Sequence, residues 1–293
     1  MTAPLGAVVI PAHNESAVIG RCLDALQPAI DEGLIQVIVA CNGCMDDTAS
    51  AARARPGVVV VELATASKAA ALRAGDRMAV PGPRIYLDAD VVMTAAAALA
   101  VMDALGRGDA LAARPPIHFD TSGARWLVRS WYSVRVRLPS IRSALWGAGT
   151  YALSVEGRAR FGEFPDIVSD DLFIDSLFSE RETVIVDTDP VVVHTPRQAA
   201  HLLGILTRTY RTQDDVERQG TGGPVSQGQR GQLRDLVDLV ARRPRFTPAA
   251  VAYVALIVLA RARAKLGGKS RQWERDESSR KVANSGGNAP ELR

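Results

Sequence analysis

Two aspartates separated by one residue, in Asp88-Ala89-Asp90, are the clearest indication of chemistry in this sequence. In an extended turn, one of two carboxylates at positions i and i+2 can reach a sugar hydroxyl while the other faces a divalent cation. Carboxylate oxygens suit Mg²⁺ or Mn²⁺, and such a cation neutralises the charge that builds on a diphosphate leaving group. Alone, this spacing is weak evidence, because solvated acidic turns are common.

Two further pairs have spacings that chemistry uses. Asp170 and Asp171 are adjacent and precede a short helical pattern, where carboxylates also serve as a helix cap that interacts favourably with the helix dipole. Cys41 and Cys44 have the spacing of half a zinc site. No second Cys or His pair follows, so two thiols in a loop are the better interpretation.

The elements that must position these residues form an alternating pattern in the first third of the chain. Short β-branched runs at 7–10, 36–40, 58–61 and 84–87 are separated by three helical patterns. The first helix is expected to follow a cap at Asn14 or Ser16, the second to begin near Asp47, and the third to cover 68–78. Continuous apolar strands separated by helices predict an α/β fold with a mostly parallel sheet covered on both faces. The polar clusters at 13–15, 42–47 and 88–90 follow strands, where such sheets bind ligands.

The remaining chain divides by composition. Residues 114–150 are aromatic and irregular, a strand at 191–193 ends in His194, and a helix is expected over 199–217. We expect one domain over 1–218 with two halves, 1–113 and 114–218, to which the family resemblance given below assigns catalysis, with nucleotide binding in the first half and acceptor binding in the second. A flexible loop at 219–232, a C-terminal helical extension at 233–267 and a polar tail at 268–293 complete the expected organisation.

Bulk properties exclude some functions. The formal net charge of +3 over 293 residues does not indicate nucleic-acid binding. Three cysteines and no secretory signal favour reduced thiols in the cytoplasm.

The uncharged run at 249–260 is shorter than the roughly 20 residues that span a bilayer. Followed by Arg261, Arg263 and Lys265, it fits either a helix on the inner face of the cell membrane or a helix packed on the domain.

Taken in order, the motifs resemble those of the family 2 glycosyltransferases with the GT-A fold. The resemblance runs from Val8 to about Arg211. It is carried by VVIPAHNE at 8–15, CNGCMDDT at 41–48, SKAAALRAG at 67–75, YLDAD at 86–90 and SDD at 169–171. Each motif alone is modest, and five in the family's order form a strong signal.

The resemblance implies a role for each matching residue. The nucleotide would lie against Pro11, Ala12, Glu15, Lys68, Asp88 and Ala89, and Asp90 would bind the Mn²⁺ or Mg²⁺. Asp171 would be the catalytic base that deprotonates an acceptor hydroxyl, with Asp170 supporting it or serving as the base itself. A histidine at the place of His194 can complete the metal shell in related enzymes, although a structural histidine is the alternative.

The sequence departs from the family pattern at two places. The family usually has an acidic residue that reads the nucleotide base where Cys41 stands, so Asn42 and Asp46 are candidates to replace it. The Gln-x-x-Arg-Trp motif of processive synthases is absent, although Arg208 and Arg211 lie in about the right region and can clamp a diphosphate.

These expectations define one function and its alternatives. We expect a metal-dependent enzyme that moves a sugar from a nucleoside-diphosphate sugar, with UDP as the first choice, to an acceptor hydroxyl by a single transfer with inversion. The acceptor would be a glycan, a lipid-linked molecule or a small molecule. A retaining enzyme of the same fold is the alternative, followed by a sugar nucleotidyltransferase, against which the first loop at 11–15 counts because it lacks a Gly-rich basic segment.

Overall fold

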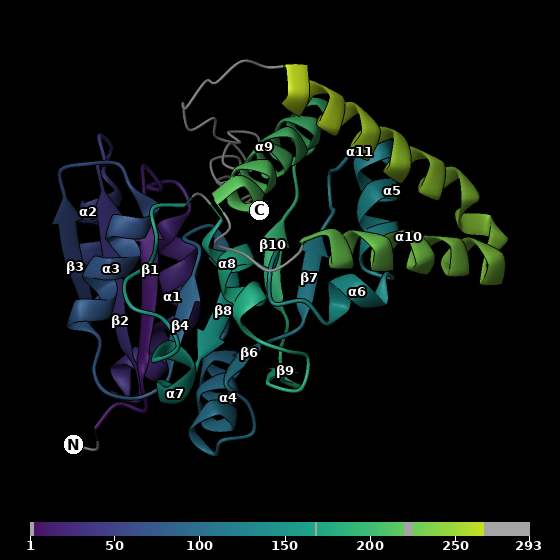
Figure 1. The fold of residues 1–293 in the computed structure, drawn as a ribbon. Helices are drawn as coiled ribbons and strands as arrows, with labels where there is room; N and C mark the ends of the chain where they lie inside the picture. The colour runs from purple at the N-terminus through teal and green to yellow at the C-terminus, as the bar shows by residue number, and fades with distance from the viewer. Residues whose placement is uncertain (1–2, 168, 220–224, 267–293) are drawn as a thin grey trace, which may run out of the picture.

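The computed structural model describes residues 3–167, 169–219 and 225–266 and has a central seven-stranded sheet (Figure 1). Six strands run in one direction and only β8 is antiparallel to its neighbours. Across the sheet the order is β3 (Val58–Leu63), β2 (Gln36–Asn42), β1 (Ala7–Ala12), β4 (Arg84–Leu87), β8 (Thr150–Leu153), β6 (Ala112–Arg114) and β9 (Thr183–Ile185). The expected α/β fold with a mostly parallel sheet is confirmed.

Helices cover both faces of this sheet because its central strands are apolar on both sides. The helices α1 (Ile19–Asp31), α2 (Thr48–Arg53) and α4 (Ala95–Gly106) pack on one face, against side chains that include Val8, Ile10 and Val39. The helices α3 (Lys68–Met78) and α8 (Asp170–Leu177) pack on the other, against Val9, Ile38 and other side chains. A short helix, α7 (Val155–Arg158), follows β8.

A second, three-stranded sheet pairs a strand from the first third of the chain with two later strands. It has the order β5 (Val91–Val92), β10 (Val191–His194) and β7 (Ile117–Asp120). Because β5 follows Asp90 directly, its antiparallel pairing with β10 connects the Asp88-Ala89-Asp90 turn to the segment that ends in His194.

A helical region lies beyond the second sheet, at the end of the molecule opposite β3 (Figure 1). It has its own apolar core, to which Trp131, Leu206 and Tyr253 belong. Its elements are α5 (Trp126–Arg135), α6 (Pro139–Arg142), α9 (Ala199–Gln219), α10 (Val225–Arg242), a short 3₁₀ helix η1 (Pro244–Phe246) and α11 (Thr247–Leu266). None of the described helices is long and apolar enough to cross a membrane.

Two sequence expectations about helices are wrong. The first helix does not begin after a cap at Asn14 or Ser16: α1 begins at Ile19 with Val18 at its cap, because Asn14 adopts a left-handed φ of 52° and the chain turns before it coils. The loop expected over 219–232 is helical from Val225, and residues 220–224 lie outside the described chain. The helical stretch continues into an apolar face with Leu236 buried, and Gly231 lies against Ser140.

The expected polar tail at 268–293 lies outside the described residues.

Candidate active site

A lysine bridges two aspartates that are far apart in the sequence. Lys68 is the first residue of α3, and its Nζ lies 2.8 Å from an oxygen of Asp88 and 2.8 Å from an oxygen of Asp170. The pKa of Asp88 is raised to about 6, mainly by burial; Lys68 opposes the shift, and the carboxylates of Asp170 and Asp90 add to it. Lys68 therefore holds together two negative groups that would otherwise repel each other in a partly buried place.

Asp170 has both of its carboxylate oxygens engaged. Its second oxygen accepts a 2.9 Å hydrogen bond from the hydroxyl of Tyr151, and the residue is only 6% exposed. The ring of Tyr151 stacks on Tyr86 with 5.0 Å between centroids. Because one of its partners is the charged ammonium of Lys68, Asp170 is held in an ion pair and is suited to supporting its neighbours.

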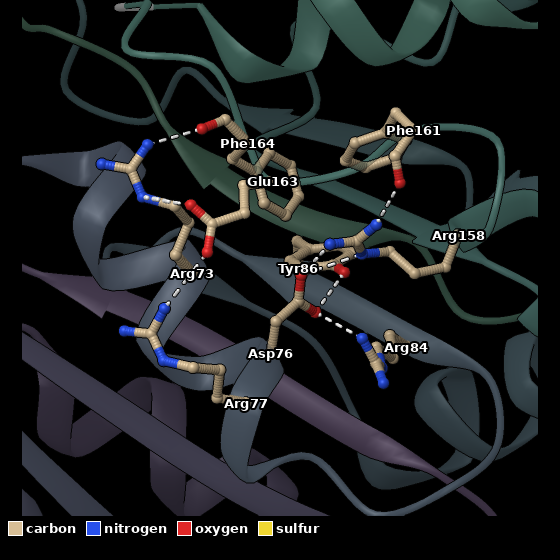
Figure 2. Close-up of polar contacts among 9 residues, drawn as sticks. All are labelled: Arg73, Asp76, Arg77, Arg84, Tyr86, Arg158, Phe161, Glu163 and Phe164. Atoms are coloured by element: carbon tan, nitrogen blue, oxygen red, sulfur yellow. Dashed lines mark hydrogen bonds and ion pairs between the residues drawn. The ribbon is translucent and has the colours of Figure 1, made fainter.

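Tyr86 in turn belongs to a polar network beneath the site, drawn in Figure 2. Asp76 accepts hydrogen bonds from the Tyr86 hydroxyl at 2.7 Å, from Arg84 Nη1 at 2.8 Å and from Arg158 Nε at 2.8 Å. Figure 2 also shows Glu163 between Arg73 and Arg77 at the edge of the same region. The network connects α3 and α7 to β4, the strand that ends immediately before Asp88.

Asp171 lies in the first turn of α8 and keeps hydrogen-bonding capacity. Its Oδ2 accepts from the backbone N–H of Gly147 at 2.9 Å and its Oδ1 from that of Leu172 at 2.9 Å, which leaves a further lone pair on each oxygen. Burial raises the pKa of the Asp171 carboxyl, and the neighbouring Asp170 raises it further. A carboxylate with a raised pKa is a stronger base, which suits proton abstraction.

A small cavity brings the four charged residues to one place. Its wall contains Lys68, Asp88, Asp170 and Asp171, together with Pro11, Leu72, Tyr86, Leu87, Gly149, Thr150 and Tyr151. Gly149 is required here: its φ is +64°, and a Cβ would lie 2.5 Å from Val91 Cγ2 and 3.3 Å from Asp88 Oδ2. Pro11, Lys68, Asp88, Asp170 and Asp171, all predicted from the sequence, therefore share one cavity.

Asp90 and His194 are the residues whose donors fit a divalent cation. Val91 pairs with Val193 between β5 and β10, and Asp90 and His194 are the residues next to this pair in the chain. His194 Nδ1 lies 3.1 Å from Asp120 Oδ2, which leaves Nε2 for a ligand, as in histidines that bind metals with a carboxylate behind them. The described residues contain no cluster of three or more His, Cys, Asp or Glu able to hold a metal by protein ligands alone. The donor set thus fits a cation that shares its shell with substrate oxygens.

The side chains of Asn42 and Asp46, both predicted to contact the nucleotide, form hydrogen bonds within the protein. The Asn42 side chain donates to Ala12 O at 2.8 Å and accepts from Ser67 N at 3.0 Å, while Asp46 accepts from the Ser16 hydroxyl at 2.7 Å and from Thr48 N at 3.1 Å. These bonds hold the loops after β1 and β2 in place. Ala12 and Ala89 are buried, and the N–H of Glu15 donates to Thr48 Oγ1 at 2.7 Å.

An open cleft between these loops adds residues from 62–66, which the sequence did not single out, to residues of the first two loop motifs. It is lined by His13, Gly43, Cys44, Met45, Glu62, Leu63, Ala64 and Ala66. Cys41 itself is buried, and burial raises the pKa of its thiol to about 12. Glu62 pairs with Cys41 in the register of β2 and β3, so a carboxylate stands beside the position where the family's acidic residue is missing.

Arg208 and Arg211 lie on α9, among the helices of the second core. Neither belongs to the wall of the small cavity. The buried Nε of Arg211 has no hydrogen-bond acceptor within the described parts of the chain. The diphosphate role predicted for these two arginines stays a prediction.

Solved structures that resemble this fold are glycosyltransferases. A mannosyltransferase from Pyrobaculum calidifontis, in complex with GDP-Man and Mn²⁺, is 17% identical with a TM-score of 0.63, covering 91% of this chain and 88% of that one. Glucosyl-3-phosphoglycerate synthase from Mycobacterium tuberculosis, in complex with Mn²⁺ and UDP-glucose, is 21% identical with a TM-score of 0.52, covering 74% and 80%. At these identities the likeness establishes the fold.

The sequence comparisons are more specific about the family. No curated protein matches the chain. The profile described as Glycosyl transferase family 2 matches residues 7–154, which contain β1 to β8 and half of the full sequence. The matched region includes Lys68 and the Asp88-Ala89-Asp90 turn. The chain is a member of glycosyl transferase family 2, and it is a glycosyltransferase with the GT-A fold.

Proposed function

We propose that this enzyme transfers a sugar from a nucleoside-diphosphate sugar to an acceptor hydroxyl in a single step with inversion. The observation that carries the proposal is the shared cavity of Lys68, Asp88, Asp170 and Asp171. It brings Lys68 and the Asp88 carboxylate together with Asp171, a carboxylate with a raised pKa that can take up a proton.

The donor is proposed to bind with Mn²⁺ or Mg²⁺ held by Asp90 and His194. A bound cation would neutralise the negative charge that develops on the diphosphate. Asp88 and Lys68 would lie beside the ribose and diphosphate, with Pro11, Ala12, Glu15 and Ala89 around the nucleotide. The loops that Asn42 and Asp46 hold in place would border the base. Arg208 and Arg211 are proposed to reach the diphosphate from α9.

In the proposed reaction Asp171 takes the proton of the acceptor hydroxyl as its oxygen forms a bond to the anomeric carbon. The bond from that carbon to the diphosphate breaks on the opposite face, and the electron pair leaves with the nucleoside diphosphate. Asp170 would support Asp171 through the positions of Lys68 and α8. A retaining enzyme would not need a base at this position, so the environment of Asp171 favours inversion.

A UDP-sugar is the proposed donor and a single transfer the proposed outcome. The Mycobacterium tuberculosis enzyme is bound to UDP-glucose, whereas the Pyrobaculum enzyme is bound to GDP-Man, so both nucleotides belong in the test. The lack of the processive motif in the sequence supports a single transfer. The acceptor is proposed to be a glycan, a lipid-linked molecule or a small molecule, without a nucleic-acid partner.

The experiment is a thermal-shift titration of UDP, GDP and their sugars, each with and without Mn²⁺ or Mg²⁺. Wild type should be stabilised by one nucleotide only when a metal is present, because a ligand that binds the native state raises its melting temperature. Asp90→Ala should lose the metal-dependent part, whereas Asp103→Ala, on the exposed side of α4, should keep it. Unchanged metal dependence in Asp90→Ala would overturn the assignment of the metal ligand.

The enzyme is also proposed to work in the cytoplasm, in peripheral contact with the inner face of the cell membrane through α11. One face of this helix packs on α5 and α9 through Tyr253 and Leu256. The other face exposes Val251, Val254, Val258 and Leu259, and Arg261, Arg263 and Lys265 follow. An exposed apolar face followed by basic residues is a surface that can contact an anionic membrane. The sequence left open a helix on the membrane or a helix packed on the domain, and α11 is compatible with both because it is packed on one face and exposes apolar residues on the other.

A further inference from the structure

Arg135 is an arginine in an aromatic enclosure next to the proposed catalytic base. It ends α5, and its guanidinium carbon lies 5.1 Å from the ring centroid of Trp131, 5.1 Å from that of Trp146 and 6.0 Å from that of Phe119. Its side chain also forms a hydrogen bond with Tyr253 on α11. Four aromatic residues from separate segments therefore hold this cation in one position.

The charge of Arg135 is not balanced by the described part of the protein. No Asp or Glu of the described residues lies within ion-pair distance of its guanidinium. Arg114 lies near enough for its charge to be affected: the pKa of Arg114 is lowered to about 10, mainly by burial, with Asp175 opposing the shift and Arg135 adding to it. Asp175 offsets the charge of Arg114, whereas the half-buried guanidinium of Arg135 has no carboxylate of its own among the described residues, which favours the binding of an anion.

A single glycine connects this cation to Asp171. The N–H of Gly147 donates to Asp171 Oδ2 at 2.9 Å, and a Cβ on Gly147 would lie 2.5 Å from Arg135 Nη2. Gly147 has a φ of +76°, which together with this contact excludes a side chain. With ordinary bond lengths between them, Asp171 Oδ2 and Arg135 Nη2 lie within about 9 Å of each other. A small molecule can span that distance.

We infer that Arg135 binds an anionic group of the acceptor, a phosphate or carboxylate, close to the hydroxyl that Asp171 deprotonates. The inference rests on the proposed function for the role of Asp171, but the anion site itself does not require it. The same chemistry occurs in a phosphorylated small alcohol and in the glycerol headgroup of an anionic phospholipid, where a hydroxyl stands a few bonds from a phosphate.

The anion site is tested by titrating the protein with inorganic phosphate at constant ionic strength and following tryptophan fluorescence. Trp131 and Trp146 flank Arg135, so binding there should change the emission with saturation, whereas chloride should not. Arg135→Gln should abolish the saturable change. Arg137→Gln is the matched control, because Arg137 lies just past the end of the same helix, is exposed and contacts Phe246. An equal response of wild type and Arg135→Gln would overturn the site.

The acceptor role is tested with transfer assays that use glycerol 3-phosphate, uncharged glycerol and vesicles of phosphatidylglycerol, with the donor found by the nucleotide screen. We expect transfer to a phosphate-bearing acceptor, with KM raised on the order of 10- to 100-fold in Arg135→Gln, kcat changed little, and partial recovery in Arg135→Lys. Product from glycerol 3-phosphate alone identifies a soluble acceptor, and product from vesicles alone identifies a lipid headgroup.

Failure of this inference differs from failure of the proposed function. If sugar is transferred equally well to charged and uncharged acceptors, and Arg135→Gln has no effect on KM, the anionic acceptor is wrong while the transferase activity stands. If no donor is consumed with any acceptor although phosphate binds at Arg135, the anion site stands and the proposed reaction is wrong.

Discussion

At the scale of single residues, the environments of Asp170 and Asp171 separate two adjacent carboxylates with the same chemistry. Asp170 is bound to the Lys68 ammonium and the Tyr151 hydroxyl, whereas Asp171 accepts only backbone N–H groups. The two possible bases that the sequence left open therefore differ in the kind of partner, because only Asp170 is held in an ion pair.

Asp171→Asn is the substitution that tests this difference. We expect the rate of transfer to fall on the order of 100- to 10,000-fold, because a general base contributes that much, while donor affinity stays near the wild-type value. Donor binding by calorimetry and single-turnover product formation measure the two effects separately. Full activity of Asp171→Asn would show that another group takes the proton.

The raised pKa of Asp88 gives a prediction about stability. Its pKa is about 6 in the folded protein against an ordinary value of 3.8, so between about pH 4 and pH 6 the folded state holds a proton that the unfolded state has lost. The contribution of Asp88 to the free energy of unfolding is therefore present at low pH and falls as pH rises through this range.

Asp88→Asn removes this titration and supplies the reference. In the metal-free protein, the stability of wild type relative to Asp88→Asn should decrease from about pH 4 to about pH 7. Urea unfolding in the presence of a chelator, at several pH values across that range, measures the difference. If the free energy of unfolding of wild type relative to Asp88→Asn stays constant or grows with pH, the pKa of Asp88 is not raised in the folded protein.

At the scale of elements, the network around Asp76 supports the site from behind (Figure 2). Its carboxylate joins α3 to Arg84 on β4 and to Arg158 on α7, and the Tyr86 hydroxyl that it binds belongs to the ring stacked on Tyr151. The position of Asp170 therefore depends on a buried carboxylate that does not touch the cavity.

Asp76→Ala leaves two arginines without their shared partner. We expect it to lower the free energy of unfolding by about 3 to 5 kcal/mol, as when one member of a buried ion pair is removed. Asp103→Ala breaks the exposed pair with Arg107 and should cost less than about 1 kcal/mol. Chemical denaturation of both variants measures the contrast. Equal effects of the two substitutions would mean that the network has no special part in stability.

Local elements could be predicted from the sequence, whereas contacts between elements distant in the chain could not. Apolar runs predicted β1 to β4 but not β6, β8 or β9, and the expected helix over 68–78 has the observed bounds because Ser67 caps it. Local patterns do not contain partners distant in the chain, such as Lys68 with Asp170, or Gly147 with Asp171 and Arg135. Asn42 and Asp46 were assigned by position to the nucleotide, although their hydrogen bonds to neighbouring loops could be seen only in three dimensions.

At the scale of the whole molecule, the helical region provides both a second core and an exposed surface. The packed face of α11 contributes Tyr253, Leu256 and Ala260 to that core, so deleting the helix would uncover α5 and α9. Substitutions on the outer face alone are therefore the suitable probe of membrane contact.

The variant with Val251, Val254 and Val258 all changed to Ser should keep its fold and lose binding to anionic vesicles. Because these side chains are exposed, the free energy of unfolding should change little, while co-sedimentation with phosphatidylglycerol vesicles should fall several-fold. Leu233 and Val237, exposed on α10, are the matched control when changed to Ser. Equal vesicle binding by the α11 variant and wild type would rule out this face as the contact.

The pairing of β5 with β10 has a consequence for how the enzyme is made. The Asp88-Ala89-Asp90 turn is synthesised early, but the strand beside it pairs with residues about 100 positions later, and the free edge of β4 is covered only when β8 has been made. At roughly 5 to 20 residues per second, the ribosome needs on the order of 5 to 20 seconds to supply the missing strand. During that interval the growing chain exposes an unpaired apolar strand edge, the kind of surface that chaperones bind. Asp88 and Asp90 belong to the first third of the chain to leave the ribosome, but they reach their final geometry only after these much later strands have been made.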